Sequence, residues 1–224
     1  MQVLLFLHRL YFFVILNIRN KKTYKMKKII FLFIISSLIS IKGIGLTLSP
    51  ETEVSILTCA PGNELYSLFG HTAIRINDPR HQIDRVYNYG TFDFSTPHFY
   101  LKYARGLLPY QLTVQKFSHF IYNYQLEERT VYAQTIRLDS LEKQRIFDLL
   151  EENLIPQNRY YLYNFLFDNC TTRSRDILLK SLPDSVAWNM PDVNKNFWNL
   201  LDEYLQASPW VQWGIHTILG QRGN

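Results

Sequence analysis

The sequence predicts an α+β fold in which an antiparallel sheet packs against helices. Three observations support this class. Runs of β-prone residues bounded by turns occupy residues 53–138, helical periodicity follows at 140–154, and another helical stretch begins at Cys170. Strands grouped ahead of helices are typical of α+β domains. The length of 224 residues and the hydrophobic content of 47% allow one domain with a substantial core.

Five segments are predicted to form the strands. Each combines β-branched or aromatic residues with apolar alternation, and turn residues bound it. The segments are residues 53–60, 66–79, 84–94, 110–117 and 129–138. The second begins its alternation after Gly70 and stops at Asn77-Asp78-Pro79, which places His71 at the start of a strand. The third then returns as the other arm of a hairpin.

Two helices are predicted from their capping residues. A short helix at 118–128 has Ser118 in position to cap it. Asp139 and Glu142 form a capping box ahead of a longer helix at 140–154. The expected apolar face of this longer helix consists of Leu141, Ile146, Leu149, Leu150 and Leu154.

The N-terminal segment is predicted to direct export. Residues 1–45 are predicted to be an N-terminal extension followed by a signal peptide. In MKKIIFLFIISSLIS (26–40), a lysine pair precedes an apolar run that is shorter than the ~20 residues needed to span a bilayer. We therefore expect Met26 to be the true start. Residues 46–200 are expected to form the main domain, and residues 201–224 a helical tail.

The positive net charge also belongs to the N-terminal segment. The first 50 residues contain no acidic side chain and eight basic ones, namely Arg9, Arg19, Lys21, Lys22, Lys25, Lys27, Lys28 and Lys42. The remaining chain holds 16 of the 24 Lys and Arg residues against all 19 Asp and Glu residues. A folded part without an excess of basic residues lacks the electrostatic signature of a nucleic-acid-binding protein, so we exclude that class.

Cys170 lies where the pattern changes from extended to helical. RYYLYNFLF precedes it as an extended run, and CTTRSRDILLKSL follows as a helix that Asp168 or Asn169 is placed to cap. A helix N-terminus favours a thiolate, and Arg173 adds positive charge one turn later. The backbone N–H of Cys170 and the side-chain amide of Asn169 are candidate donors to an oxyanion.

A nucleophilic cysteine needs a base, and His71 is the best candidate. It follows a glycine at a strand start, where the backbone approaches its neighbours closely and the ring is held in place. The other histidines of the predicted mature chain lie in a polar turn, in aromatic contexts without a rigid element or in the tail, namely His81, His98, His119 and His216.

The residues alone leave other roles open for the two cysteines. Cys170 is also consistent with a small buried hydrophobic residue, and a disulfide with Cys59 is possible in an exported protein. His71 is equally consistent with a structural role at the end of a strand. The spacing of these residues is consistent with a catalytic role for Cys170 and His71, but it does not decide between this role and a structural one.

Three separated segments point to a known family. LTCAPGNELYSLFGHTAIRI, YNYGTFDF and YYLYNFLFDNCTTRSRDIL occur in this order, and together they resemble the N-terminal periplasmic domain of Lnb, the lipoprotein N-acyltransferase of Bacteroides-type bacteria. The likeness extends over about residues 53–218. It implies a permuted papain-like (NlpC-like) core with the nucleophilic cysteine at a helix N-terminus, in which the strand histidine precedes the helix cysteine.

The resemblance implies a two-step acyl transfer. Cys170 would attack a phospholipid ester with His71 as general base, and the resulting thioester would pass its acyl group to the N-terminal amine of a lipoprotein. Asn88 is the candidate for the third member of the catalytic set, although a residue at a strand end also forms turns. No cofactor or metal is expected, and the expected location is the periplasm at the surface of the inner membrane.

Four further residues are candidates for the edge of the substrate cleft, each with an ordinary structural alternative. Tyr66 and Ser67 either border the cleft or pack a turn, while Arg75 and Arg173 either meet lipid phosphate or form salt bridges. Lnb carries transmembrane helices after this domain, so we expect the chain to stop short of them. The rival functions are a cell-wall peptidase or amidase of the NlpC type and a non-catalytic envelope-binding domain.

Overall fold

The computed structural model describes residues 45–104, 106–182, 194–206 and 208–219. The predicted signal segment and the expected start at Met26 lie outside these residues. The described part is an α+β structure, as the sequence predicts, and it is built on a six-stranded antiparallel sheet with the order β5-β1-β2-β3-β4-β6. The strands are β1 (Glu53–Cys59), β2 (His71–Asp78), β3 (Ile83–Thr91), β4 (Pro109–Lys116), β5 (Val131–Thr135) and β6 (Tyr160–Leu162).

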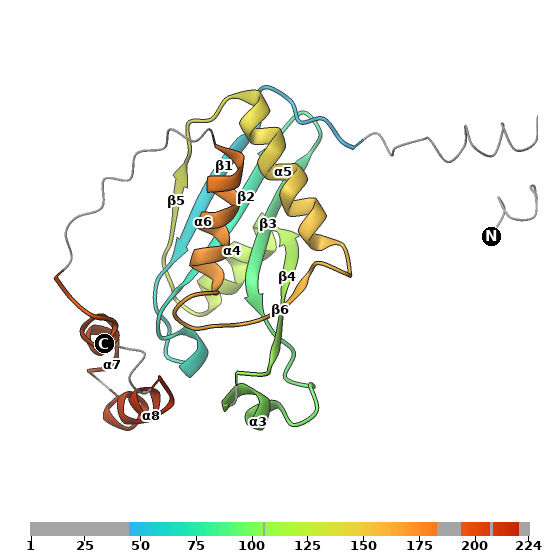
Figure 1. The fold of residues 1–224 in the computed structure, drawn as a ribbon. Coiled ribbons are helices and arrows are strands. Elements are labelled where there is room, and N and C mark those ends of the chain that lie inside the picture. The colour runs from blue at the N-terminus through green and yellow to red at the C-terminus, as the bar shows by residue number, and fades with distance from the viewer. Residues whose placement is uncertain (1–44, 105, 183–193, 207, 220–224) are drawn as a thin grey trace, which may run out of the picture. The chain divides into compact units, whose positions relative to one another are not determined.

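Helices lie on both faces of this sheet (Figure 1). The described helices are the short 3-10 helix η1 (Leu65–Ser67) and the α-helices α3 (Phe99–Ala104), α4 (Phe117–Leu126), α5 (Ser140–Leu154), α6 (Cys170–Ser181), α7 (Phe197–Leu205) and α8 (Pro209–Leu219). Helices α5 and α6 pack on one face, and α4 packs on the other. None of the described helices combines the length and the apolar character needed to cross a membrane.

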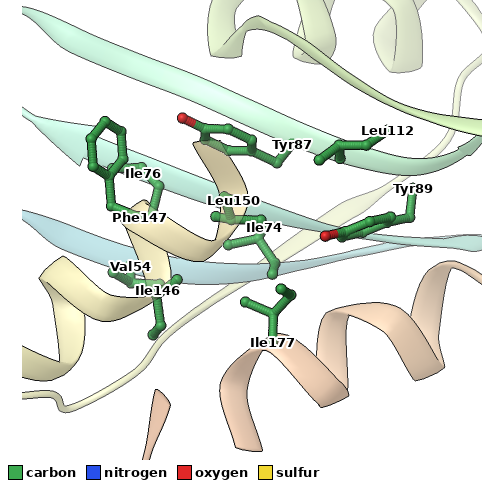
Figure 2. Packing of buried hydrophobic residues seen from close by; sticks show 10 residues of the cluster. All are labelled: Val54, Ile74, Ile76, Tyr87, Tyr89, Leu112, Ile146, Phe147, Leu150 and Ile177. Carbon is green, nitrogen blue, oxygen red and sulfur yellow. The ribbon is translucent and has the colours of Figure 1, made fainter. Parts of the chain in front are cut away.

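The larger core lies between the sheet and helices α5 and α6. Period-two alternation in β2 sends Ile74 and Ile76 to this face and Ala73 to the opposite face, where it packs with Phe120 of α4. Figure 2 shows the side chains of the larger core, which are Val54, Ile74, Ile76, Tyr87, Tyr89, Leu112, Ile146, Phe147, Leu150 and Ile177. Because α6 contributes Ile177 to this core, the helix that begins at Cys170 is anchored against the sheet.

Two local predictions for the helices are corrected by the structure. Helix α4 begins at Phe117 after Lys116, and no side chain caps it, so Ser118 lies inside the first turn. Leu141 of α5 is 59% exposed, while Phe147, which we did not place on the apolar face, is buried. Leu141 belongs to the first turn of α5, where exposure costs little, whereas Phe147 reaches the sheet beside Ile146.

Removal of the α5 cap is expected to destabilise the protein. Asp139 accepts a hydrogen bond from the backbone of Glu142 at 2.8 Å, and the Glu142 carboxylate accepts one from the backbone of Asp139 at 2.8 Å. Asp139→Ala should therefore lower the free energy of unfolding by about 1 kcal/mol. Ser118→Ala is the matched control and should be neutral in the same urea titration, because the exposed Ser118 caps nothing. Equal effects of the two substitutions would contradict the assignment.

Candidate active site

Cys170 is the first residue of α6 and is half-buried. Asn169 is the N-cap, and its side-chain oxygen accepts hydrogen bonds from the backbone N–H groups of Thr171 and Thr172, each at 3.0 Å. The Thr172 hydroxyl accepts the backbone N–H of Asn169 at 2.8 Å, which completes a capping box. This cap explains why the helix begins at the cysteine, and it leaves the thiol beside the positive end of the helix dipole.

His71 is held at the start of β2 by an obligatory glycine. Gly70 has a φ of +72°, and a Cβ atom there would lie 2.5 Å from the carbonyl oxygen of Cys59. The β1–β2 register pairs Cys59 with His71. The chain thus enters β2 in contact with β1. This close approach fixes the backbone position of His71, from which the imidazole side chain extends.

The imidazole of His71 joins Cys170 and Asn88. It forms a hydrogen bond with the thiol of Cys170, and its Nε2 atom lies 3.3 Å from Oδ1 of Asn88. Asn88 lies on β3 and is only 6% exposed. With Nε2 directed at an amide oxygen, which only accepts, Nε2 carries the proton, and Nδ1 is the ring nitrogen left for the sulfur. Three residues separated by up to 99 positions therefore form one connected set.

Two threonines join the starts of β2 and α6. Thr72 and Thr171 immediately follow the histidine and the cysteine, and their hydroxyl oxygens lie 2.9 Å apart. The backbone N–H of Thr72 and the hydroxyl of Thr171 also hydrogen bond to the Cys170 thiol. Neither threonine was among the site residues predicted from the sequence. Their positions next to the two candidates were visible, but their pairing depends on how α6 packs on the sheet.

The surroundings of Cys170 favour its thiolate. Burial by itself raises the pKa of this thiol, but the hydrogen bond and positive charge of His71 lower it, and so do the donors on Thr72 and Thr171. The balance holds the pKa of Cys170 below the ordinary value for a thiol. This arrangement gives Cys170 a larger thiolate fraction than an ordinary thiol has at the same pH.

Cys59 has a different environment. It is 2% exposed in the core between the sheet and α4, and burial raises its pKa to about 11. Both cysteines are free thiols in the structure. This finding excludes the disulfide alternative for the structure and leaves Cys59 as a buried packing residue.

The other histidines of the described chain either pair with carboxylates or are exposed. Nδ1 of His81 lies 2.8 Å from the carboxylate of the buried Asp78, and Nε2 of His216 lies 2.8 Å from that of Asp202. His98 and His119 are exposed. In the part of the chain that the structure describes, no group of three or more His, Cys, Asp or Glu residues is placed to hold a metal ion.

A protein-family model described as the Lnb N-terminal periplasmic domain matches residues 47–202, which is more than half of the chain. The chain belongs to this family. The match confirms the resemblance seen in the sequence motifs, and a periplasmic domain agrees with the export predicted from the N-terminal segment. Comparisons with curated proteins and with solved structures gave no significant match.

In this Lnb N-terminal domain, two of the predicted polar residues support the start of α6. The side-chain oxygen of Asn169 caps α6 and its amide nitrogen donates to the carbonyl of Phe165 at 2.9 Å, so both polar atoms of the side chain are engaged. Arg173 makes two hydrogen bonds to Asp168, at 2.5 and 2.8 Å, and its guanidinium lies 3.5 Å from the ring centroid of Tyr161. These contacts favour the salt-bridge alternative for Arg173.

The three remaining residues proposed for the substrate cleft have different environments. Arg75 pairs with Asp84 through two hydrogen bonds, at 2.7 and 2.9 Å, and stacks on Phe117. Ser67 is buried and donates to the carbonyl of Glu64, so it stabilises the η1 turn. Tyr66 alone is well exposed, at 56%. The Lnb domain thus uses Arg75 and Ser67 in local packing and presents Tyr66 to solvent.

Iodoacetamide is expected to alkylate Cys170 of this Lnb domain before Cys59 at neutral pH. Only a thiolate reacts, and the pKa of Cys170 lies below the ordinary value while that of Cys59 is about 11. His71→Ala removes the imidazole that lowers the pKa, so the pKa should rise and labelling at pH 6 should slow. The difference in Cys170 labelling between the native protein and His71→Ala should narrow as the pH rises, because Cys170 then ionises in both proteins, whereas Cys59 with its pKa of about 11 stays largely protonated.

Peptide mass spectrometry over a pH series measures this selectivity. Equal labelling of Cys59 and Cys170 in the native protein would contradict the burial of Cys59. An unchanged pH profile in His71→Ala would show that the imidazole does not tune the thiol.

Proposed function

We propose that this domain is a cell-envelope cysteine acyltransferase that moves an acyl chain from a phospholipid to the N-terminal amine of a lipoprotein. The observation that carries the proposal is the Cys170 thiol at the start of α6, hydrogen bonded to His71, whose other ring nitrogen faces Asn88. A nucleophile, a base and an orienting group in this order are the components of covalent acyl transfer. Membership of a periplasmic family supports the choice of envelope substrates.

The proposed first step forms a thioester. The Cys170 sulfur attacks the carbonyl carbon of the phospholipid ester, and His71 holds the proton that the thiol has lost. The tetrahedral oxyanion collapses, the bond from carbon to the glycerol oxygen breaks, and His71 protonates that oxygen as lysophospholipid leaves. We assign the backbone N–H of Cys170 as an oxyanion donor, because the side-chain amide of Asn169 already donates to the carbonyl of Phe165.

The proposed second step transfers the acyl group to an amine. The lipoprotein α-amine attacks the thioester carbonyl, its proton passes to His71, and the Cys170 thiolate leaves. Asn88 keeps the imidazole in the Nε2-protonated form throughout, so that Nδ1 exchanges the proton. No redox partner or metal enters either step.

A papain-like ancestry of the permuted kind is part of this proposal. The strand that starts with His71 precedes the helix that starts with Cys170, which is the chain order of the permuted papain-like enzymes that the motifs resemble. The antiparallel sheet with the cysteine helix packed on one face supports the same assignment.

Intact mass spectrometry after incubation with phosphatidylethanolamine vesicles tests the proposal. The protein should gain one acyl chain on Cys170 that hydroxylamine removes, and a diacylglyceryl-cysteine peptide should then discharge it and become N-acylated. Cys170→Ala is the control and should remain unmodified. Failure to form the adduct, together with cleavage of peptidoglycan fragments, would replace the proposal with the peptidase or amidase alternative. Inactivity on both substrates would favour the envelope-binding domain.

A further inference from the structure

Six aromatic rings form a continuous cluster beside the Cys170–His71 pair. They come from η1, from the β3–α3 connection, from α3 and β4, and from the segment after β6. We call this set the aromatic cluster, and its members are Tyr66, Phe92, Phe94, Phe99, Tyr110 and Tyr163. Neighbouring rings in the set have centroids between 4.4 and 6.2 Å apart. Residues distant in sequence thus build one apolar surface.

The cluster has a buried base and an exposed rim. Tyr110 is 7% exposed and stacks on Tyr163 at 4.4 Å, whereas Tyr66 and Phe94 are 56% and 60% exposed. Phe92 connects the two parts, with its ring 5.2 Å from Tyr110 and 5.0 Å from Phe94. An aromatic rim that packs on one buried ring and on half-buried ones is a preformed surface that needs little ordering when it binds an apolar ligand.

The cluster meets the reactive residues at two places. On one side, Tyr66 lies in the η1 turn, where the Ser67 carbonyl accepts the backbone N–H of Gly70 at 3.0 Å, directly before His71. On the other side, a Cβ atom on Gly90 would lie 3.6 Å from Cβ of Cys170 and 3.7 Å from the ring of Tyr163. Gly90 has a φ of +86° and no side chain, so the thiol and the cluster border the same stretch of bare backbone.

The chemistry of the cluster indicates an apolar ligand. Its six side chains are phenylalanines and tyrosines without a carboxylate or an ammonium group, and the nearby Asp93 carboxylate accepts a hydrogen bond from the Ser95 backbone at 2.8 Å within its own turn. A polypeptide would bring many backbone N–H and C=O groups, for which the cluster offers only the hydroxyls of Tyr66, Tyr110 and Tyr163, whereas a hydrocarbon chain needs only apolar contact with the rings. Of the groups that the proposed reaction places at Cys170, the acyl chain is the one that fits.

We propose that the aromatic cluster binds the acyl chain of the donor and of the Cys170 thioester, a proposal that rests on the acyltransferase function proposed above. The ester carbonyl lies at the sulfur, and the hydrocarbon chain runs past Gly90 and Tyr163 towards the rim formed by Tyr66 and Phe94. The cluster is therefore a specificity subsite that favours long acyl chains over short ones.

The chain-length dependence of Cys170 acylation tests the subsite without a bilayer. The full chain is mixed with 4-nitrophenyl butyrate or dodecanoate at concentrations where no micelles form, and the acylation of Cys170 is followed by mass spectrometry. The native protein should favour the dodecanoyl ester by about a hundredfold, because several added methylenes become buried. Phe94→Ser should reduce this ratio about tenfold, and Tyr66→Ser should act in the same direction.

Tyr132→Ser is the matched control. Tyr132 is 66% exposed on β5, at the opposite edge of the sheet from β4 and β6, so its loss should leave the ratio unchanged. A second measurement avoids the acylation chemistry: Cys170→Ala should bind dodecanoate, and adding Phe94→Ser should weaken that binding about tenfold. Circular dichroism of each variant shows that the fold is retained.

The outcomes separate the subsite from the reaction. Acylation of Cys170 with no preference between the esters, or a preference that Phe94→Ser leaves unchanged, overturns the subsite while the acyltransferase stands. A Phe94 effect on vesicle binding alone would assign the rim to the bilayer surface and also overturn it. Dodecanoate binding that depends on Phe94, in a protein that no donor acylates, would retain the apolar site and refute the reaction.

Discussion

Exchange of His71 for alanine is expected to slow acylation of Cys170 by phospholipid by a factor of about 100 to 10,000 at neutral pH. The imidazole supports both stages of thioester formation, because it lowers the pKa of the thiol and returns the proton to the leaving oxygen. Cys170→Ala should abolish the adduct altogether, since no other described thiol is accessible at the site. The measurement is the time course of the hydroxylamine-sensitive mass increase.

His119→Ala is the control for this experiment. His119 is exposed on α4, on the face of the sheet opposite α6, and should be replaceable without effect on acylation. Native rates in His71→Ala would refute the proposed base. A large loss in His119→Ala would point to a different histidine in the reaction.

Gly70→Ala is expected to have the largest effect on stability of any single-methyl addition near the site. The added Cβ would lie 2.5 Å from the backbone oxygen of Cys59, and the φ of +72° is itself unfavourable for alanine. We expect the free energy of unfolding to fall by about 3 kcal/mol, because strand backbone rather than a flexible side chain must move. The midpoint of thermal unfolding should fall by roughly 6–12 °C.

Gly106→Ala separates the two causes of that loss. Gly106 has a φ of +65°, but among the described residues beyond its chain neighbours no heavy atom lies within 4 Å of its Cβ position. Its substitution should therefore cost only the conformational part, about 1 kcal/mol. If both variants lose the same stability in urea titrations, the close contact between Gly70 and β1 adds nothing to the free energy of unfolding and does not fix the position of His71.

Local signals explain why several elements could be predicted from the sequence. The capping box of Asp139 and Glu142 marks the start of α5, and both residues make the expected bonds. Asn169, one of two candidate caps, is the N-cap of α6, so the position of Cys170 on its helix was also predictable. Ser118 shows the limit of such signals, because a capping residue type does nothing when the chain enters the helix one residue earlier, after Lys116.

Pairings between distant residues could be proposed only in part. Asn88 was assigned to the imidazole because it lies on the neighbouring hairpin arm, and the structure places its oxygen 3.3 Å from His71. No comparable signal in the sequence indicated the hydrogen bond between the hydroxyls of Thr72 and Thr171. Nor did the sequence distinguish Tyr66, which joins the exposed rim, from Ser67, which stabilises a turn, because the two residues are adjacent and differ only in how the chain turns around them.

Residue order and local capping determine that a thiol begins a helix and that an imidazole follows a glycine into a strand, because these features depend on neighbours within a few positions. Their meeting depends on the tertiary structure. Helix α6 is held on the sheet by Ile177 in the core and by Thr171 against Thr72, and this packing brings Cys170 to His71 across 99 residues of chain. The same packing places Gly90 between the thiol and the aromatic cluster. Burial of apolar surface decides which segments meet, because it acts between segments however far apart they lie in the sequence.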